Sequence, residues 1–158
     1  MFLLNLIPAP LHRALYRLAH AVRVQVWRVW RPDVHGVRVI VLDGQDRVLL
    51  VRHSYGSNKW MPPGGGMRRG EDPLLAGARE LLEETGCRIV QPRVLQISDE
   101  KLHGTSNAVR IVLGRTGDEP RADGREIIEA RFFALDALPA HMSERMAQRV
   151  QAWAAQIT

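Results

Sequence analysis

The sequence predicts a single domain of the α/β or α+β class, because strand-like and helix-like patterns alternate along the chain. Three observations lead to this prediction. Two apolar runs flank an Asp-Gly turn, a glycine-rich loop leads into a helix with clear start and stop signals, and a further strand and helix close the chain. With 158 residues and 46% hydrophobic content, the chain has the usual size of one domain and can bury a core.

Residues 1–33 form a basic arm that we separate from the domain at 34–158. All 17 acidic residues lie at or after Asp33, whereas five arginines precede it: Arg13, Arg17, Arg23, Arg28 and Arg31. Removing these five from the 22 basic residues leaves 17, which balance the 17 acids, so the net charge of +5 comes from the part of the arm before Asp33. Because the body is neutral, we expect no stable nucleic-acid complex.

The arm from Leu11 to about Trp30 has a helical pattern. Its apolar residues recur at steps of three and four, and the arginines fall mostly elsewhere. The later part, VRVQVWRVW, also fits an extended strand, so the end of the helix stays open. Three interpretations remain: a helix packed on its own domain, a homodimer contact, or weak contact with an anionic membrane surface.

No targeting or membrane segment is expected. The apolar residues 1–7 lack a preceding positive charge and end at Pro8, and no run reaches the length of a transmembrane helix. We therefore expect a soluble, unprocessed protein. The single cysteine, Cys87, excludes an internal disulfide and fits the reducing cytoplasm; its apolar position predicts a core residue.

The first strands of the domain are predicted on either side of a turn. Val37–Leu42 is a β-branched apolar run, Asp43 opens the turn, and Val48–Val51 is the partner strand of a hairpin. Arg52 and His53 follow at the end of this hairpin, towards the glycine loop. An exposed Arg-His pair is the alternative to a role in binding.

The segment GGGMRRGEDPLLAGARELLEETGC, residues 64–87, contains the main functional signal. Three glycines allow a backbone to approach a ligand closely. Asp72 and Pro73 are a typical N-cap and first helical residue, and Gly86 ends the helix. Helical spacing places three carboxylates on one side of this helix: Glu80, Glu83 and Glu84.

Like charges at this spacing destabilise a helix by roughly 0.2–0.5 kcal/mol per pair. A hard divalent cation with oxygen ligands would compensate for this repulsion. A solvated acidic surface is the structural alternative. The acids, however, come with a glycine loop, an upstream acid and an arginine at fixed distances.

This combination resembles the Nudix box, G-x5-E-x7-R-E-U-x-E-E-x-G-U, in which U is a bulky apolar residue. Every fixed position is matched over 23 residues, by Gly65, Glu71, Arg79, Glu80, Glu83, Glu84 and Gly86. Leu81 and Cys87 fill the apolar positions, although the family more often has an aliphatic residue at the second. The resemblance implies an α/β/α sandwich around a mixed β-sheet, to which the amphipathic N-terminal helix is an addition.

The resemblance also implies an activity, the Mg²⁺-dependent hydrolysis of a nucleoside diphosphate linked to another moiety, with Mn²⁺ as a further candidate. It implies metal ligation by Glu80, Glu83, Glu84 and the carbonyl of Gly65 or its neighbour. Arg79 would pair with a carboxylate and keep it ionised. Glu80 is the first candidate for general base and Glu126 the second, while Glu129 also fits the position of the late acid.

Substrate contacts are implied for the glycine loop and the preceding strand end, that is, for Gly64, Gly65, Gly66, Arg52 and His53. Trp60, in the W-x-x-P-G-G-G entry to the loop, is interpreted as a packing residue, with substrate stacking as the alternative. The sequence lacks the downstream signatures of the ADP-ribose, diadenosine polyphosphate, coenzyme A and NADH branches. A nucleoside triphosphate and a nucleotide sugar therefore both remain open.

The rest of the chain is predicted as strands, loops and a helix in this order: a strand at Arg88–Ile97 interrupted by Pro92, a loop at Asp99–Asn107 with His103, a strand at Ala108–Leu113, a loop at Gly114–Gly124, a strand with Phe132 and Phe133, and a helix at Ser143–Ala155. A catalytically silent nucleotide-binding module and a diphosphate isomerase on the same fold are the rival functions. A P-loop is excluded, because GGGMRRGE lacks the required lysine and hydroxyl.

Overall fold

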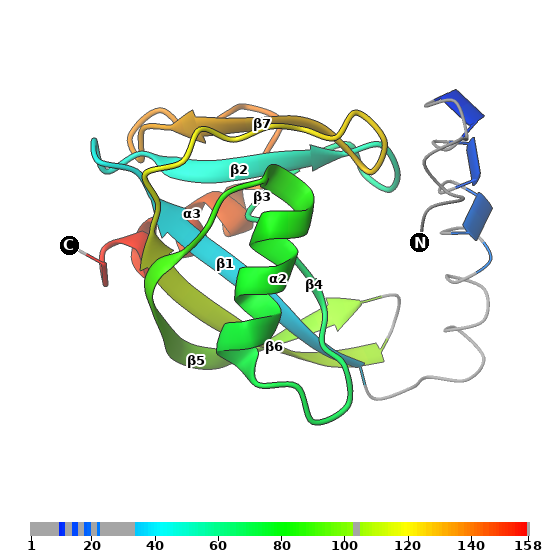
Figure 1. Cartoon of the computed structure of the whole chain (residues 1–158), viewed down its shortest axis with the longest axis horizontal. Coiled ribbons are helices and arrows are strands. Elements are labelled where there is room, and N and C mark those ends of the chain that lie inside the picture. Colours follow the sequence, from blue (N-terminus) through cyan, green and yellow to red (C-terminus); the bar gives the residue numbers. More distant parts are fainter. Residues whose placement is uncertain are drawn as a thin grey trace.

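The computed structural model describes residues 34–102 and 105–157, together with residues 10, 11, 14, 15, 18, 19 and 22 of the arm. Within this part, a seven-stranded sheet lies between two helices (Figure 1). The elements are β1 (Val34–Leu42), β2 (Val48–His53), β3 (Trp60–Met61), β4 (Gly64–Gly66), α2 (Pro73–Thr85), β5 (Val90–Leu102), β6 (Thr105–Arg115), β7 (Ile127–Phe133) and α3 (Glu144–Ala154).

The sheet is mixed, as predicted. Its main path runs β3-β2-β1-β6-β5, while β4 pairs with β1 and β7 pairs with β2. The central pair β1–β6 is parallel and the other pairs are antiparallel. The α/β/α sandwich expected from the resemblance is therefore confirmed.

Side-chain alternation along β1 produces a core on each face of the sheet. Ile40 and Leu42 belong to the cluster that includes Trp153 of α3, whereas Val39 and Val41 belong to the cluster beneath α2. All four β1 side chains are fully buried. Successive side chains of a strand point to opposite faces, so a run of apolar residues predicts a strand covered on both sides.

The predicted hairpin between the first two strands is formed only at its turn. β1 and β2 share one residue pair, Leu42 with Val48. Beyond this pair, β1 is occupied by β6 on one edge and by β4 at Gly36–Arg38 on the other, so β2 diverges and pairs with β7 along its length. The turn itself forms as predicted, because Asp43 accepts hydrogen bonds from the backbone of Gln45 and Arg47.

The prediction of a loop at Asp99–Asn107 is wrong. β5 continues to Leu102 and β6 begins at Thr105, and the two strands pair along the whole stretch. Backbone pairing with a neighbouring strand has here overridden the polar composition that favoured a loop. His103 lies outside the described residues. The prediction for Pro92 is confirmed, because β5 is an edge strand whose register shifts between Val90 and Arg93.

The two helices begin and end at the predicted signals. The Asp72 side chain accepts hydrogen bonds from the first turn of α2, and Gly86 ends the helix with φ 72°. Ser143 caps α3, which buries Val150 and Trp153. α2 packs closely on the sheet at Gly77, where a Cβ atom would meet the Val112 side chain at 3.2 Å.

Three further interpretations concern single residues. Trp60 is buried and packs edge-on against Phe133, with ring centroids 4.8 Å apart, so its packing role is confirmed. Phe132 and Phe133 pack against different core clusters. Cys87 is fully buried, as predicted for a core residue.

The described residues of the arm are helical between residues 10 and 22. Their large apolar side chains are exposed by 46–62%: Leu11, Leu15, Leu18 and Val22. These four side chains are therefore not buried. The rest of the arm lies outside the described residues, so all three interpretations of the arm stay predictions. In the described part of the chain, no helix is long and apolar enough to cross a membrane.

Candidate active site

A pocket lined by five carboxylates lies between α2 and the segment that leads into β7. α2 contributes Glu80, Glu83 and Glu84, the segment before β7 contributes Asp123 and Glu126, and the first residue of β7, Ile127, completes the lining. The predicted acids of the helix and the preferred late acid are thus in one place. Glu129, the other late acid considered, instead pairs with Arg52 at 3.1 Å.

Asp123 was missed by the sequence analysis. It lies in the loop predicted at Gly114–Gly124, where an aspartate before a glycine reads as a turn residue. The structure supports that local role, because one oxygen of Asp123 accepts hydrogen bonds from the backbone of Arg125 and Ile127. The same residue also lines the pocket, and its spacing three residues before Glu126 was the available signal.

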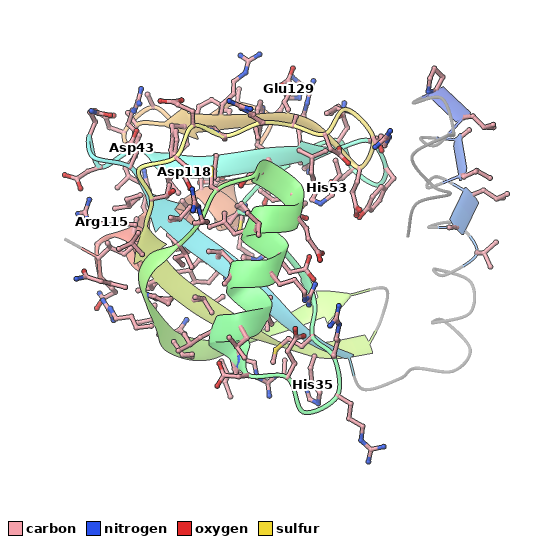
Figure 2. The ribbon with its side chains drawn as sticks, viewed as in Figure 1. His35, Asp43, His53, Arg115, Asp118 and Glu129 are labelled. Carbon is pink, nitrogen blue, oxygen red and sulfur yellow. The ribbon has the colours of Figure 1, made fainter. Side chains whose placement is uncertain are left out.

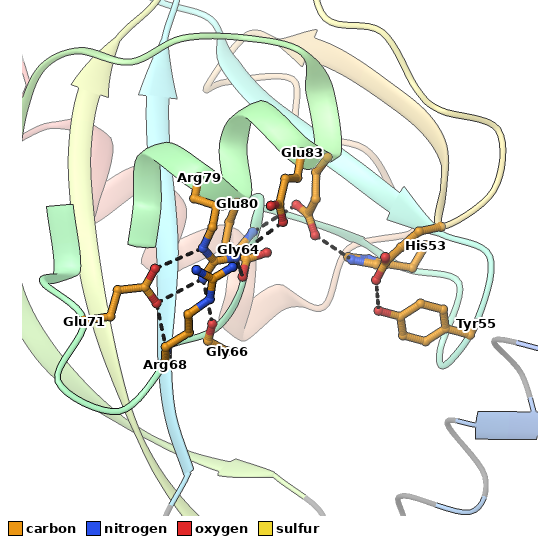
Figure 3. A network of polar contacts seen from close by, with 11 residues as sticks. His53, Tyr55, Gly64, Gly66, Arg68, Glu71, Arg79, Glu80 and Glu83 are labelled. Atoms are coloured by element: carbon orange, nitrogen blue, oxygen red, sulfur yellow. Dashed lines mark hydrogen bonds and ion pairs between the residues drawn. The ribbon is translucent and has the colours of Figure 1, made fainter. Parts of the chain in front are cut away.

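Arg79 connects the acids of the box (Figure 3). Its guanidinium binds Glu71 through two nitrogens, at 3.0 and 3.1 Å, and Glu80 through Nη1 at 2.7 Å. It also contacts Glu83 at 3.3 Å and donates to the carbonyl of Gly66 at 3.1 Å. The predicted pairing of Arg79 with a carboxylate is therefore seen with three of them.

These contacts fix the charge of Glu71. Hydrogen bonds from Arg79 and from the backbone of Arg68 lower the pKa of Glu71 to about 2. The carboxylates in turn raise the pKa of Arg79 above its ordinary value. Glu71, which closes the loop by accepting from Arg68, therefore stays ionised under all physiological conditions.

The pKa values of Glu80 and Glu84 are raised, in contrast to that of Glu71. Burial raises the pKa of Glu80, and the neighbouring carboxylates add to this effect, while Arg79 opposes it. Burial also raises the pKa of Glu84, whose side chain is only 7% exposed. His53 and the backbone N–H of Gly64 oppose that shift. Two carboxylates at least half buried and close together are electrostatically costly without a cation between them.

The chemistry of these donors fits a hard divalent cation, because all are carboxylate oxygens. Across residues 34–102 and 105–157, however, no group of three His, Cys, Asp or Glu residues is arranged to hold a metal ion. Glu80 contacts Arg79 at 2.7 Å and Glu84 contacts His53 at 3.1 Å, while both side chains line the pocket. Ligation by the Gly65 carbonyl stays a prediction.

The three glycines of β4 have different roles. Gly64 donates its N–H to Glu84 at 3.0 Å and has φ 151°, and a Cβ atom there would lie 2.2 Å from the Val37 carbonyl oxygen. A Cβ atom on Gly65 would lie 2.6 Å from the Glu80 carboxyl group, whereas one on Gly66 would meet nothing within 4 Å. β4 therefore passes too close to the backbone of β1 for any residue but glycine at position 64, whereas a side chain at position 65 would displace the carboxyl end of Glu80.

Substituting each glycine by alanine should separate these roles. We expect Gly64→Ala to unfold the domain or lower its melting temperature strongly, because the clash is with backbone. Gly65→Ala should fold but displace Glu80, with turnover falling about 10- to 100-fold. Gly66→Ala is the matched control for space within the fold: it should leave the melting temperature unchanged and lower turnover less than Gly65→Ala. Thermal denaturation and steady-state kinetics test this order, and equal effects at Gly65 and Gly66 would contradict it.

The structure separates the two residues predicted at the end of β2. His53 contacts Glu84 through Nε2 at 3.1 Å. Arg52 lies on the other face of the strand, where its guanidinium is 5.7 Å from the Trp60 ring centroid and pairs with Glu129. Figure 2 shows His53 and Glu129 on opposite sides of the β2–β7 pair. His53 thus adjoins the acidic pocket, whereas Arg52 does not line it.

Comparison with solved structures gives the same fold. A MutT NUDIX hydrolase from Burkholderia pseudomallei superposes with a TM-score of 0.67 at 22% identity, covering 80% of this chain and 99% of that one. A MutT protein from Methanosarcina mazei superposes with a TM-score of 0.63 at 21% identity, covering 81% and 97%. At this level of identity, the likeness shows the architecture alone.

The fold and the acidic box helix place the protein in one class, a mixed-sheet sandwich that carries the Nudix box. The model of the NUDIX domain matches residues 33–154, and the chain belongs to this family. Similar curated proteins include the m7GpppN-mRNA hydrolase NUDT17 of Xenopus laevis, with 48% identity over 58 residues (34% of this chain, 20% of that protein). Another is the RNA pyrophosphohydrolase of Thioalkalivibrio sulfidiphilus, with 46% identity over 57 residues (36% and 31%).

Proposed function

We propose that this protein is a Mg²⁺-dependent pyrophosphohydrolase that cleaves a nucleoside diphosphate linked to another moiety. The observation that supports this most is the convergence of five carboxylates from two segments on one pocket beside the glycine strand. The alignments cover only about a fifth to a third of the two curated relatives above, so their activities suggest a reaction class.

The reaction adds water across a phosphoanhydride. A water oxygen forms a bond to phosphorus, the bridging P–O bond breaks, and the water proton passes to a general base. Mg²⁺, when bound, would neutralise the phosphate charge and polarise the phosphoryl oxygen. The ligands would be Glu80, Glu83 and Glu84, with the Gly65 carbonyl beside them. Mn²⁺ suits the same oxygen donors.

The remaining residues orient these groups. Arg79 holds Glu71, Glu80 and the Gly66 carbonyl, and so ties the start of the box to α2. The N–H groups and small size of the glycines of β4 let a diphosphate approach the helix. The general base is Glu80 or Glu126, both of which line the pocket. Glu80 is also a proposed metal ligand, whereas Glu126 is not. Comparing Glu80→Gln with Glu126→Gln therefore distinguishes the two candidates for the base.

The identity of the second moiety is the finer part of the proposal. The curated relatives include RNA pyrophosphohydrolases, an m7GpppN-mRNA hydrolase and a mouse diphosphoinositol polyphosphate phosphohydrolase, the last with 39% identity over 56 residues. The neutral domain gives no sign of an extended nucleic-acid surface. We therefore favour a small nucleotide, either a nucleoside triphosphate or a nucleotide sugar.

A substrate panel tests this assignment. It holds canonical and oxidised nucleoside triphosphates, nucleotide sugars, ADP-ribose, diadenosine polyphosphates, 5′-triphosphorylated RNA and a diphosphoinositol polyphosphate. We expect one small nucleotide to be cleaved far faster than the rest, with Mg²⁺ required, when phosphate and nucleotide products are measured at alkaline pH. Faster cleavage of the RNA would show that the substrate is a polymer end.

Two other outcomes identify the rival functions. If nothing is cleaved but a nucleotide raises the melting temperature, the protein is a binding module. If an isomerised diphosphate accumulates without hydrolysis, it is an isomerase on this fold. The presence of all box acids, together with Asp123 and Glu126 in the pocket, favours hydrolysis over both.

A further inference from the structure

The end of β2 and the residues that follow it contact two acids of the pocket. His53 and Tyr55 lie two residues apart, with ring centroids 5.2 Å apart. Each reaches a different pocket acid: His53 contacts Glu84 at 3.1 Å, and the Tyr55 hydroxyl donates to Glu126 at 2.6 Å (Figure 3). Neither aromatic residue belongs to the Nudix box, and Tyr55 has no role in the function proposed above.

Glu126 needs such support because its own backbone lies outside the sheet. It precedes β7, which begins at Ile127, in a segment without helix or strand. The pairing of β2 with β7 is irregular close to Glu126. Arg52 pairs with Glu129 and His53 pairs with Ile127, so Ile128 of β7 has no partner on β2 in this register. Such irregularities often redirect side chains next to functional sites. Here the irregularity lies two residues after Glu126 in the chain, next to the pocket that Glu126 lines.

Two hydrogen bonds then attach Glu126 to the end of β2. The N–H of Ser54 donates to the Glu126 carbonyl at 2.8 Å, and the Tyr55 hydroxyl donates to its carboxylate. The first bond fixes the backbone and the second fixes the side chain. An O–H group bonded to a carboxylate at this distance is a strong, charge-assisted contact. Without it, a glutamate side chain has several rotamers that leave the pocket.

We propose that Tyr55 is a positioning residue, whose hydroxyl holds the Glu126 carboxylate in the orientation that the hydrolytic reaction uses. This inference rests on the proposed function, because it assigns Glu126 a role in the reaction. Tyr55 acts through Glu126 and contacts no reacting atom itself. The alternative role for Tyr55 is to stack its ring on the substrate. Stacking would require only the ring, whereas positioning Glu126 requires the hydroxyl.

The decisive variants are Tyr55→Phe and Tyr55→Leu. Tyr55→Phe removes the hydroxyl and keeps the ring beside His53. We expect kcat to fall about 10- to 100-fold, as small misplacements of a catalytic group do, with KM changed less than about 2-fold. Tyr55→Leu should lose no more than Tyr55→Phe. Full activity in Tyr55→Phe, with activity lost only in Tyr55→Leu, would overturn the proposal and favour stacking.

A double-mutant cycle with Glu126→Gln tests the route of the effect. If Tyr55 acts through Glu126, Tyr55→Phe should change kcat less than about 2-fold in the Glu126→Gln background. A full additional loss in that background would show that Tyr55 acts elsewhere. Glu126→Gln with unchanged kcat would also overturn the inference, while leaving hydrolysis itself established.

The same four proteins should be unfolded in urea, which needs no activity. We expect the midpoint shift of the double variant to be smaller than the sum of the single shifts, because the two residues share one contact. If the wild type hydrolyses no substrate, the proposed function fails and the catalytic role of Tyr55 fails with it. If hydrolysis occurs but the urea shifts are simply additive, the Tyr55–Glu126 contact is absent in solution and only this inference fails.

Discussion

Replacing Glu84 by glutamine is expected to lower turnover by roughly 10²- to 10³-fold, the range observed when one electrostatic group is removed from an active site. Glu84 is only 7% exposed, receives the N–H of Gly64 and the His53 ring, and lines the pocket. The amide keeps the size and one acceptor oxygen but loses the charge that would attract a cation. Initial rates on the preferred substrate, at saturating Mg²⁺, measure the loss, and near-wild-type turnover would exclude Glu84 from the site.

The same substitution should not destabilise the metal-free protein. Burial raises the pKa of Glu84 above its ordinary value of 4.5, so the folded protein retains this proton more readily than the unfolded chain. The contribution of Glu84 to stability is therefore complete below 4.5 and is lost as the pH rises through the raised pKa. Glutamine does not ionise, so the Glu84→Gln variant does not lose this stability as the pH rises. In EDTA, its melting temperature should equal or exceed that of the wild type, and the advantage should grow from acidic to neutral pH.

Calorimetric titration with Mn²⁺ completes this prediction. Wild-type protein should bind the ion, and Glu84→Gln should bind it at least about 10-fold more weakly. If Glu84→Gln instead melts far below the wild type at neutral pH, the buried carboxylate stabilises the fold through His53 and Gly64, and its loss of activity would be structural. Stability retained together with lost binding is the result that assigns Glu84 to the site.

The sequence predicted the parts of this site that depend on local spacing. Asp72 and Gly86 mark the ends of α2, and helical periodicity places the box acids on one side. The apolar run Val37–Leu42 predicted a strand, and the structure buries its side chains on both faces of the sheet. These features depend on residues a few positions apart, so they are visible without a structure.

Contacts between distant segments could not be predicted in the same way. The Tyr55–Glu126 bond joins residues 71 positions apart, and Asp123 looks like an ordinary turn residue until β7 brings it to α2. The divergence of β2 from β1 is also a tertiary effect, because β4 and β6 occupy both edges of β1. Arg52 and His53 look equivalent in sequence, yet strand alternation sends them to different faces.

Arg79→Ala should affect both stability and activity. The arginine is 21% exposed and its partners Glu71 and Glu80 are 12% and 14% exposed, so removing it leaves poorly hydrated carboxylates without their partner. Because the pair is partly exposed, its loss should cost less than the loss of a fully buried ion pair. We expect the melting temperature to fall by several degrees.

Turnover should fall about 10- to 100-fold, because Glu80 loses the group that orients it. Arg79→Lys keeps the charge but cannot bridge Glu71, Glu80 and the Gly66 carbonyl at once, so it should recover part of the stability and little of the activity. Arg88→Ala is the matched control. It removes another arginine–carboxylate pair, with Asp118, but Arg88 is 81% exposed, so the melting temperature should change little.

The pH dependence of the stability difference between wild type and Arg79→Ala identifies the cause of that difference. Hydrogen bonds from Arg79, and secondly from the backbone of Arg68, lower the pKa of Glu71 from 4.5 to about 2. The stabilisation from the Arg79–Glu71 pair is therefore complete above 4.5 and is lost as the pH falls towards 2. The gap between wild type and Arg79→Ala should therefore be widest near neutral pH and should narrow between pH 4.5 and 2, as Glu71 becomes protonated in both proteins. A gap that is independent of pH would mean that Arg79 stabilises the fold by packing its side chain rather than by binding the carboxylates of the box.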